Sequence, residues 1–331
     1  MSRLLTRRRL HRPADCLLLA AILVAYLALS VTYTLASPLY EPTDEIRHFR
    51  YVRHLISYRE LPVQRADARA QSHHPPLYYM LGALATGWIE IPEEVYYEPP
   101  INPYWGYRYW EVSDDNKNQY VHGDGEQFPF HGITLAVRIV RGMTILIGCG
   151  VVWLTYRIGR ELAPGCRAVA AGAAAMVALN PQFLYLSGAV NNDVPAALCS
   201  AAATLVCIRL IRGGPRLGAD ITLGVLYGLA LLTKFNLAAL LAPIGLAYLL
   251  SFWRSRNWKA ALRGVAVVLG ITVLLSGWWF WRNWMLYGDP TGMSKVNELW
   301  SGREPSENWW NLWQSLPYLW SSLWGRFGYG Q

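Results

Sequence analysis

The stretch Cys16–Ala36, CLLLAAILVAYLALSVTYTLA, runs for 21 residues without a charged side chain. A helix of about 20 predominantly apolar residues is long enough to cross a lipid bilayer. Six later blocks are apolar enough to do the same, although the fifth of the seven is short for a span. These later blocks are 133–156, 167–187, 194–211, 219–233, 235–252 and 264–281. The sequence therefore predicts an all-α polytopic membrane protein with about seven transmembrane helices.

The composition excludes several other classes of protein. Of the 331 residues, 53% are hydrophobic and only 16% are charged, which argues against a disordered chain. The net charge of +8 comes from basic residues that flank the apolar blocks, so we expect membrane lipids as partners and no nucleic acid. The five cysteines lie in or beside apolar blocks without metal-binding spacing, and we interpret them as small apolar side chains.

The distribution of charge predicts the orientation in the membrane. If 75–91 does not cross, one side of the membrane collects 15 basic residues against three acids, Asp15, Glu161 and Asp220. Cytoplasmic loops carry an excess of Lys and Arg. We therefore predict a multi-pass membrane protein with a cytoplasmic N-terminus, and we place His74–Glu90 as a helix on the outer leaflet.

This topology leaves two large segments outside. The first, 37–132, belongs to a transmembrane module that we assign to residues 1–281. The second, 282–331, follows the last span. Ten of the 16 tryptophans fall between Trp278 and Trp324, and Trp favours the membrane–water interface. We therefore predict that 282–331 forms a Trp-rich segment on the outer surface.

Two carboxylates, Asp44 and Glu45, follow the outer end of the first span. In one interpretation they cap a helix, because Thr43-Asp44-Glu45 precedes the apolar residues Ile46 and Phe49. In the other interpretation, a carboxylate at the membrane surface acts as a general base. Asp193, in the short turn after the third span, is predicted to reach the same outer face. It also has a capping alternative, because Pro195 follows it.

The remaining candidates are basic side chains near predicted outer ends of spans. Lys234 lies at the tip of the hairpin 219–252, and Arg282 follows the last span. Either can contact a phosphate, or it can merely anchor a helix at the headgroups. Arg138 and Arg141 lie one turn apart within the second span, where an arginine is costly, so at least one should face a cavity or an acidic partner. His74 precedes Pro75-Pro76, which start a helix in the simpler interpretation.

These segments together resemble the membrane-embedded GT-C glycosyltransferases, particularly bacterial protein-mannosyltransferase-like and aminoarabinose-transferase-like proteins. The resemblance covers nearly the whole chain and depends on the order of six matching pieces. They are Asp44-Glu45, His74-Pro75-Pro76-Leu77-Tyr78-Tyr79, Arg138, Asn192-Asp193, Thr233-Lys234 and Arg282-Asn283 with Tyr287-Gly288-Asp289-Pro290.

The resemblance implies a seven-helix module that transfers a sugar, with inversion, from a polyprenyl-phosphate donor at the outer face. The acceptor is a glycan, a lipid or a protein. It implies Asp44 as the catalytic acid residue with Glu45 beside it, and His74, Asp193, Lys234, Arg282 and Arg138 as substrate-binding positions. A divalent cation held by Asp44, Asp193 and His74 is possible, and no other cofactor is expected.

Two features depart from the family pattern. Such enzymes usually continue with further spans or a soluble domain where this sequence stops, so we expect a C-terminally truncated member. The segment 92–131 has no assigned counterpart. The alternative function is a non-catalytic polytopic membrane protein, such as a transporter or a lipid- or glycan-binding component. Candidate acids on only one side of the membrane favour the enzyme, because transporters more often place polar groups at broken helices in mid-span.

Overall fold

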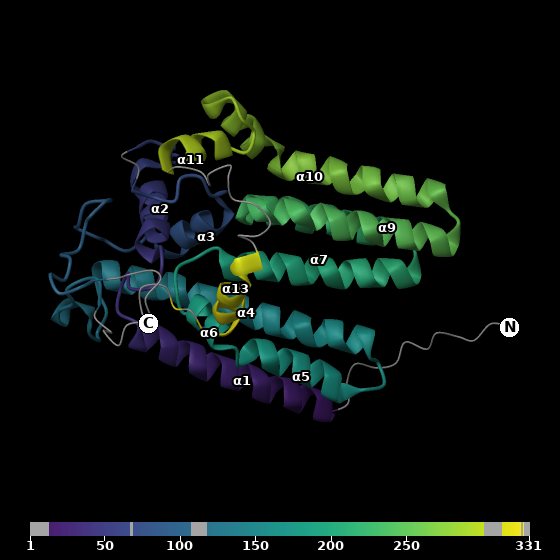
Figure 1. Ribbon diagram of the computed structural model, residues 1–331, viewed down its shortest axis with the longest axis horizontal. Coiled ribbons are helices and arrows are strands. Elements are labelled where there is room, and N and C mark those ends of the chain that lie inside the picture. The colour runs from purple at the N-terminus through teal and green to yellow at the C-terminus, as the bar shows by residue number, and fades with distance from the viewer. Residues whose placement is uncertain (1–12, 67–68, 107–117, 301–312, 326, 328–331) are drawn as a thin grey trace.

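Long apolar helices dominate the computed structural model, which describes residues 13–66, 69–106, 118–300, 313–325 and 327. Every named element in these ranges is helical, so the all-α fold class is confirmed. The long helices lie side by side in one bundle, and the shorter helices α2, α3 and α11 gather at one end of it (Figure 1). The bundle helices are α1 (Pro13–Ala36), α4 (Gly132–Leu162), α5 (Arg167–Ala178), α6 (Pro181–Ser187), α7 (Asp193–Gly213), α8 (Leu217–Thr233), α9 (Leu241–Ser255) and α10 (Trp258–Tyr287).

The number of spans differs from the seven that the sequence predicts. Within the described residues, five helical segments are long and apolar enough to cross a membrane. One of them is α9 together with the 3-10 helix η2 (Phe235–Leu240) that precedes it, and α5 with α6 makes a sixth if the bent pair is one span. The pair bends by 59°. The break occurs because Asn180 caps α6 by accepting a hydrogen bond from the Phe183 amide, and Pro181 at the first turn cannot continue α5. Helix α8, at 17 residues, is apolar but falls below the length of a span, as the sequence indicated.

The end of the bundle that carries α2 and α3 has an opposite end (Figure 1), and the residues at that opposite end are rich in arginine. Helix α1 begins there, as do α5, α8 and α10. Each of the three acids predicted for this side pairs with arginine. The pairs are Asp15 with Arg160 and Arg167, Glu161 with Arg209 and Arg212, and Asp220 with Arg263. These acids therefore cross-link neighbouring helices and do not weaken the positive charge bias that predicts the orientation.

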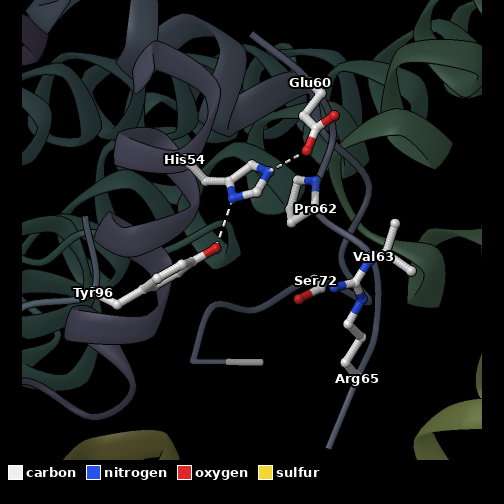
Figure 2. Close-up of a pocket in the computed structure, with 7 residues that line it drawn as sticks. All are labelled: His54, Glu60, Pro62, Val63, Arg65, Ser72 and Tyr96. Carbon is white, nitrogen blue, oxygen red and sulfur yellow. Dashed lines mark hydrogen bonds and ion pairs between the residues drawn. The ribbon is translucent and has the colours of Figure 1, made fainter. Parts of the chain in front are cut away.

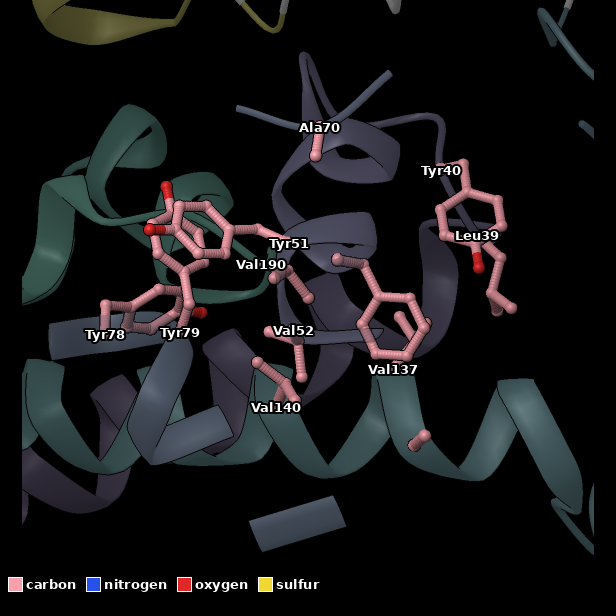
Figure 3. Close-up of a cluster of buried hydrophobic side chains, with 12 residues drawn as sticks. Leu39, Tyr40, Tyr51, Val52, Ala70, Tyr78, Tyr79, Val137, Val140 and Val190 are labelled. Carbon is pink, nitrogen blue, oxygen red and sulfur yellow. The ribbon is translucent and has the colours of Figure 1, made fainter. Parts of the chain in front are cut away.

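The loop between α1 and α4 folds onto the other end of the bundle. It contains α2 (Glu45–Tyr58), α3 (Leu77–Thr86) and the short 3-10 helix η1 (Asp124–Glu126). Apolar residues of α2 and α3 pack onto α4 in one buried cluster, in which Val52 faces Val140 (Figure 3). A Cβ added at Gly82 would lie 3.0 Å from a Val52 methyl group, so the glycine permits the close approach of α3 to α2. At 10 residues α3 is too short to cross a bilayer, which agrees with the predicted non-crossing helix at 74–90.

The last part of the chain packs back against the bundle. Helix α10 extends beyond the predicted apolar block 264–281 and past Arg282 to Tyr287. Helix α11 (Met293–Trp300) follows, and α13 (Leu316–Trp324) lies against α6, where Asn180 Nδ2 donates to the Leu323 carbonyl (2.8 Å). Part of the predicted Trp-rich surface segment, 301–312, lies outside the described residues, and the assignment of 1–281 and 282–331 as separate units stays a prediction.

Candidate active site

A fully buried ion pair joins three segments at the α2/α3 end of the bundle. Arg141 of α4 donates from Nε and Nη2 to both carboxylate oxygens of Glu45, at 2.7 and 2.5 Å. The same guanidinium donates to carbonyl groups of Thr34, Ser37 and Pro38 at the end of α1. Glu45 also accepts from the Val190 amide (2.8 Å). The expectation that Arg138 or Arg141 has an acidic partner is therefore confirmed for Arg141.

This pair fixes the position of Asp44 beside the turn that leads into α7. Glu45 is the first residue of α2 and has no exposed surface, so its oxygens are committed to structural contacts. This placement favours a positioning role for Glu45 over its role as a second-choice base. The Val190 amide that Glu45 holds is three residues before Asp193. The ion pair thus brings the start of α2 and the start of α7 together.

Asp44 has an unusual backbone and a free carboxylate. Its φ of 59° and ψ of 2° lie in the left-handed region, which Asp adopts more readily than most residues. It occupies the N-cap position of α2, but its side chain makes no capping hydrogen bond, so the capping interpretation of the Asp44 side chain is wrong. Strained backbone of this kind is concentrated at functional sites.

Asp193 and Lys234 lie beside Asp44. Lys234 Nζ is 2.5 Å from Asp193 Oδ1, and Asn192 Nδ2 donates to the Thr233 carbonyl (2.9 Å). These contacts join the start of α7 to the end of α8 and confirm Lys234 at the tip of the predicted hairpin. Partial burial raises the pKa of Asp44, the cations of Arg47 and Lys234 lower it, and the Asp193 carboxylate raises it again, with a net rise. Asp44 therefore titrates closer to neutral pH than an isolated aspartate.

His74 is part of a column of aromatic rings next to these charges. The His74 ring contacts His73 (4.1 Å between centroids) and stacks on His48 (5.5 Å). His48 stacks on Tyr79 and shares a hydrogen bond between its Nδ1 and the Tyr79 hydroxyl (2.7 Å). Burial, together with the positive charge of Lys234, lowers the pKa of His48 to about 3 and that of His73 to about 4. The histidines are therefore neutral at physiological pH and suited to hydrogen bonding with uncharged groups.

Arg282 lies at the far end of this column. Tyr79 stacks on Tyr51 (4.0 Å), and burial raises the pKa of Tyr51 while the neighbouring Arg282 cation opposes the rise. Arg282 Nη2 donates to the carbonyl groups of Leu61 and Pro62, and Nη1 is buried without a hydrogen-bond partner. The structure thus separates Arg282 from Lys234 by the ring column, and the guanidinium anchors the segment that follows α2.

Arg138 contacts an aromatic ring, and the proposed metal ligands do not form a metal site. The Arg138 guanidinium packs over the Phe130 ring (5.3 Å) and is one turn from Arg141. Among the described residues, no three His, Cys, Asp or Glu side chains are arranged to hold one metal ion, so Asp44, Asp193 and His74 form no such site. A divalent cation at Asp44 would therefore need ligands from a substrate, for example phosphate oxygens.

Sequence reasoning did not select two residues of this site. His48 is one helical turn after Asp44, and Tyr79 ends the motif His74–Tyr79. The spacing of four residues between Asp44 and His48 could have indicated that the two side chains lie together, because residues i and i+4 share a face of a helix. The contact of His48 with Tyr79, 31 residues away, depends on the packing of α3 on α2.

Comparisons with known proteins support the fold. Residues 134–281, which run from α4 to α10, match the family of dolichyl-phosphate-mannose-protein mannosyltransferases. The structure of the S. cerevisiae protein O-mannosyltransferase Pmt1-Pmt2 complex bound to the sugar donor shares the fold with a TM-score of 0.57 and 18% identity over 84% of this chain. The resemblance to membrane mannosyltransferases is therefore confirmed over residues 134–281, and the solved structure supports the fold.

The extent of these matches defines what the GT-C resemblance covers. The family match includes Arg138, Asp193 and Lys234, whereas Asp44, Glu45, His74 and Arg282 lie outside residues 134–281. The alignment covers 35% of the yeast chain, so this chain spans about a third of the length of that relative. None of the curated proteins matches the sequence.

Proposed function

We propose that this protein is a GT-C glycosyltransferase that transfers a sugar from a polyprenyl-phosphate donor to an acceptor hydroxyl. The observation that carries the proposal is the juxtaposition of the unused carboxylate of Asp44 with the Asp193–Lys234 pair at one end of a membrane bundle. A GT-C family match across α4 to α10 supports it. The opposite end of the bundle is rich in arginine, and because cytoplasmic loops carry an excess of Lys and Arg, this supports a site on the outer face of the plasma membrane.

Asp44 is the general base in the proposed reaction. The acceptor hydroxyl oxygen attacks the anomeric carbon from the side opposite the phosphate, so the new glycosidic bond forms with inversion as the bond to the phosphate oxygen breaks. The hydroxyl proton passes to Asp44, and the bonding electrons leave with the lipid phosphate. The raised pKa of Asp44 makes its carboxylate a stronger base than that of an ordinary aspartate.

Lys234 is the proposed cation for the donor phosphate. Its side chain is 19% exposed at the end of the bundle, where a lipid phosphate would lie at headgroup depth. Asp193 holds Nζ in place and is itself half exposed, so a phosphate can approach the same ammonium group. Arg282 remains a proposed phosphate contact through Nη1. Asp44 and phosphate oxygens together are the proposed ligands of any divalent cation.

The alternative is a non-catalytic membrane protein that transports or binds lipids or glycans. The broken pair α5–α6 resembles the discontinuous helices of transporters. However, the polar side chain at the break, Asn180, makes contacts with the Phe183 amide and the Leu323 carbonyl and so is occupied by the protein itself. The break therefore gives the transporter no free polar site, and the enzyme explains the Asp44 carboxylate better.

The test is turnover of a polyprenyl-phosphate sugar by the purified full chain in lipid nanodiscs. Asp44→Asn preserves the shape of the side chain but removes its basicity, and we expect the rate to fall by about 10²–10⁴-fold. Lys295→Gln is the control, because Lys295 pairs with Glu298 on the exposed helix α11. Normal turnover by a well-folded Asp44→Asn protein would reject Asp44 as the base. Absence of turnover in the unmodified chain, with donor binding intact, would favour the non-catalytic alternative.

A further inference from the structure

A small cavity lies between the last turn of α2 and the segment that follows it (Figure 2). Its volume is about 160 Å³. His54 comes from α2 and Glu60 from the chain just after it. Val63 and Arg65 come from the extended chain 61–65, and Ser72 closes one side. At about 30 Å³ per water molecule, the cavity has room for a single small ring and not for a folded peptide segment.

The cavity and the candidate active site are lined by neighbouring residues of the sequence. Ser72 is buried and directly precedes His73, which begins the ring column beside Asp44 and Lys234. The opposite wall is fixed by α10 and the turn after it, because Arg282 binds the carbonyl groups of Leu61 and Pro62 and the Tyr287 hydroxyl accepts from the Gln64 amide. The walls are thus held by the same elements that hold the candidate site.

His54 presents an unfilled hydrogen-bonding position to this cavity. Its side chain is only 10% exposed, and its Nδ1 shares a hydrogen bond with the Tyr96 hydroxyl (2.6 Å). Within the part of the chain that the structure describes, its Nε2 has no hydrogen-bond partner, and a Glu60 carboxylate oxygen lies 3.9 Å away (Figure 2). A buried polar atom without a partner is costly and calls for an explanation. A ligand group between Nε2 and Glu60 would satisfy it.

The lining chemistry indicates a neutral, hydroxyl-rich ligand. Burial lowers the pKa of His54, so the imidazole is neutral and its Nε2 either donates or accepts according to its tautomer. A hydroxyl group matches both cases because it donates and accepts. Glu60 adds a negatively charged acceptor, and Arg65 adds positively charged donors. The two charges oppose each other, so neither a cationic nor an anionic ligand is favoured over a neutral one.

We propose that this cavity, with His54 Nε2 and Glu60 as its polar contacts, binds a sugar unit of the acceptor. The proposal rests on the proposed glycosyltransferase function and makes it more specific, because it selects a glycan over a protein acceptor. The sugar sits beside Ser72, which directly precedes His73 of the ring column.

The test is a titration of the full chain in detergent micelles with methyl α-mannopyranoside, followed by saturation-transfer NMR, with acetyl-threonine amide as the competing acceptor mimic. We expect the glycoside to bind. His54→Leu and Glu60→Ala should each weaken its binding about three- to tenfold, the effect of losing one hydrogen bond. Glu60 is largely exposed, so its variant should fold even if the His54 variant does not. Glu94→Gln, an exposed acid of the same loop outside the cavity, is the matched control and should bind normally.

The outcomes separate this proposal from the proposed function. No glycoside binding, or binding that neither cavity variant weakens, overturns the sugar cavity. Binding of acetyl-threonine amide that depends on Glu60 overturns it in favour of a protein acceptor. In the turnover assay, Glu60→Ala should raise the KM for a glycan acceptor, whereas the control Glu94→Gln should leave that KM unchanged. Loss of all turnover in the unmodified chain would reject the enzyme without removing the His54-dependent binding of the glycoside.

Discussion

The buried pair of Glu45 and Arg141 is the residue-scale contact on which the site geometry depends. Removing one partner of a buried ion pair leaves an uncompensated charge, at a cost of about 3–5 kcal/mol. We therefore expect Glu45→Gln to lower the unfolding temperature strongly in a fluorescence melt of the detergent-solubilised protein. Glu161→Gln, which removes a partly exposed partner of Arg209, should have a small effect of about 0–1 kcal/mol.

The double variant Glu45→Gln with Arg141→Met separates charge burial from simple loss of packing. If the uncompensated charge is the cause, removing both charges should restore part of the lost stability. A double variant less stable than either single variant would contradict this account of the pair.

Lys234 also determines the pH at which Asp44 ionises. The base must be deprotonated, so the rate falls as the pH drops through the raised pKa of Asp44. The Lys234 cation lowers that pKa, and Lys234→Met should therefore move the acid limb of the profile of kcat/KM to higher pH. Asp193→Asn removes a carboxylate that raises the pKa and should move the limb the opposite way, provided Lys234 stays in place. Superimposable profiles for the three proteins would exclude this electrostatic coupling.

At the scale of elements, His122 links two parts of the loop between α1 and α4. Its Nδ1 is 2.6 Å from Glu126 and its Nε2 is 2.8 Å from Glu41, while the same two acids accept amides of Leu39, Gln119 and Tyr120. Burial alone would lower the pKa of His122, but the hydrogen bonds to Glu126 and Glu41 raise it to about 9. Glu41, which forms one side of this link, lies three residues before Asp44 in the sequence.

The His122 link should weaken under alkaline conditions. Its folded pKa lies above the ordinary value of 6.5, so its stabilising contribution is complete below about pH 6.5 and is lost as the pH rises through about 9. We expect amide hydrogen exchange of residues 118–126, corrected for intrinsic rates, to lose protection between pH 7 and 10. His122→Gln should have low protection at every pH. A wild-type loop whose corrected protection stays constant over this range would contradict the prediction.

At the scale of the whole molecule, the arginine-rich end and the Asp44 end of the bundle should face opposite sides of the membrane. In a background with all five cysteines replaced, Glu94→Cys should react with a membrane-impermeant maleimide added to intact cells. Arg256→Cys, which is exposed at the turn between α9 and α10, should react only after the cells are opened. Labelling of Arg256→Cys from outside in intact cells would contradict the proposed orientation.

The sequence by itself determined the helical membrane class, the arginine-rich end and the convergence of Asp44, Asp193 and Lys234. These follow from local hydropathy and from counting spans, because helix ends separated by an even number of crossings return to one face. Contacts between distant segments were decided only by the tertiary structure. The Glu45–Arg141 pair joins residues 96 apart, the ring column requires α3 to pack on α2, and Arg282 turns toward Leu61 and Pro62. Hydropathy indicates that a segment is buried in lipid or protein, but the partner of each buried polar group depends on how the helices pack against one another.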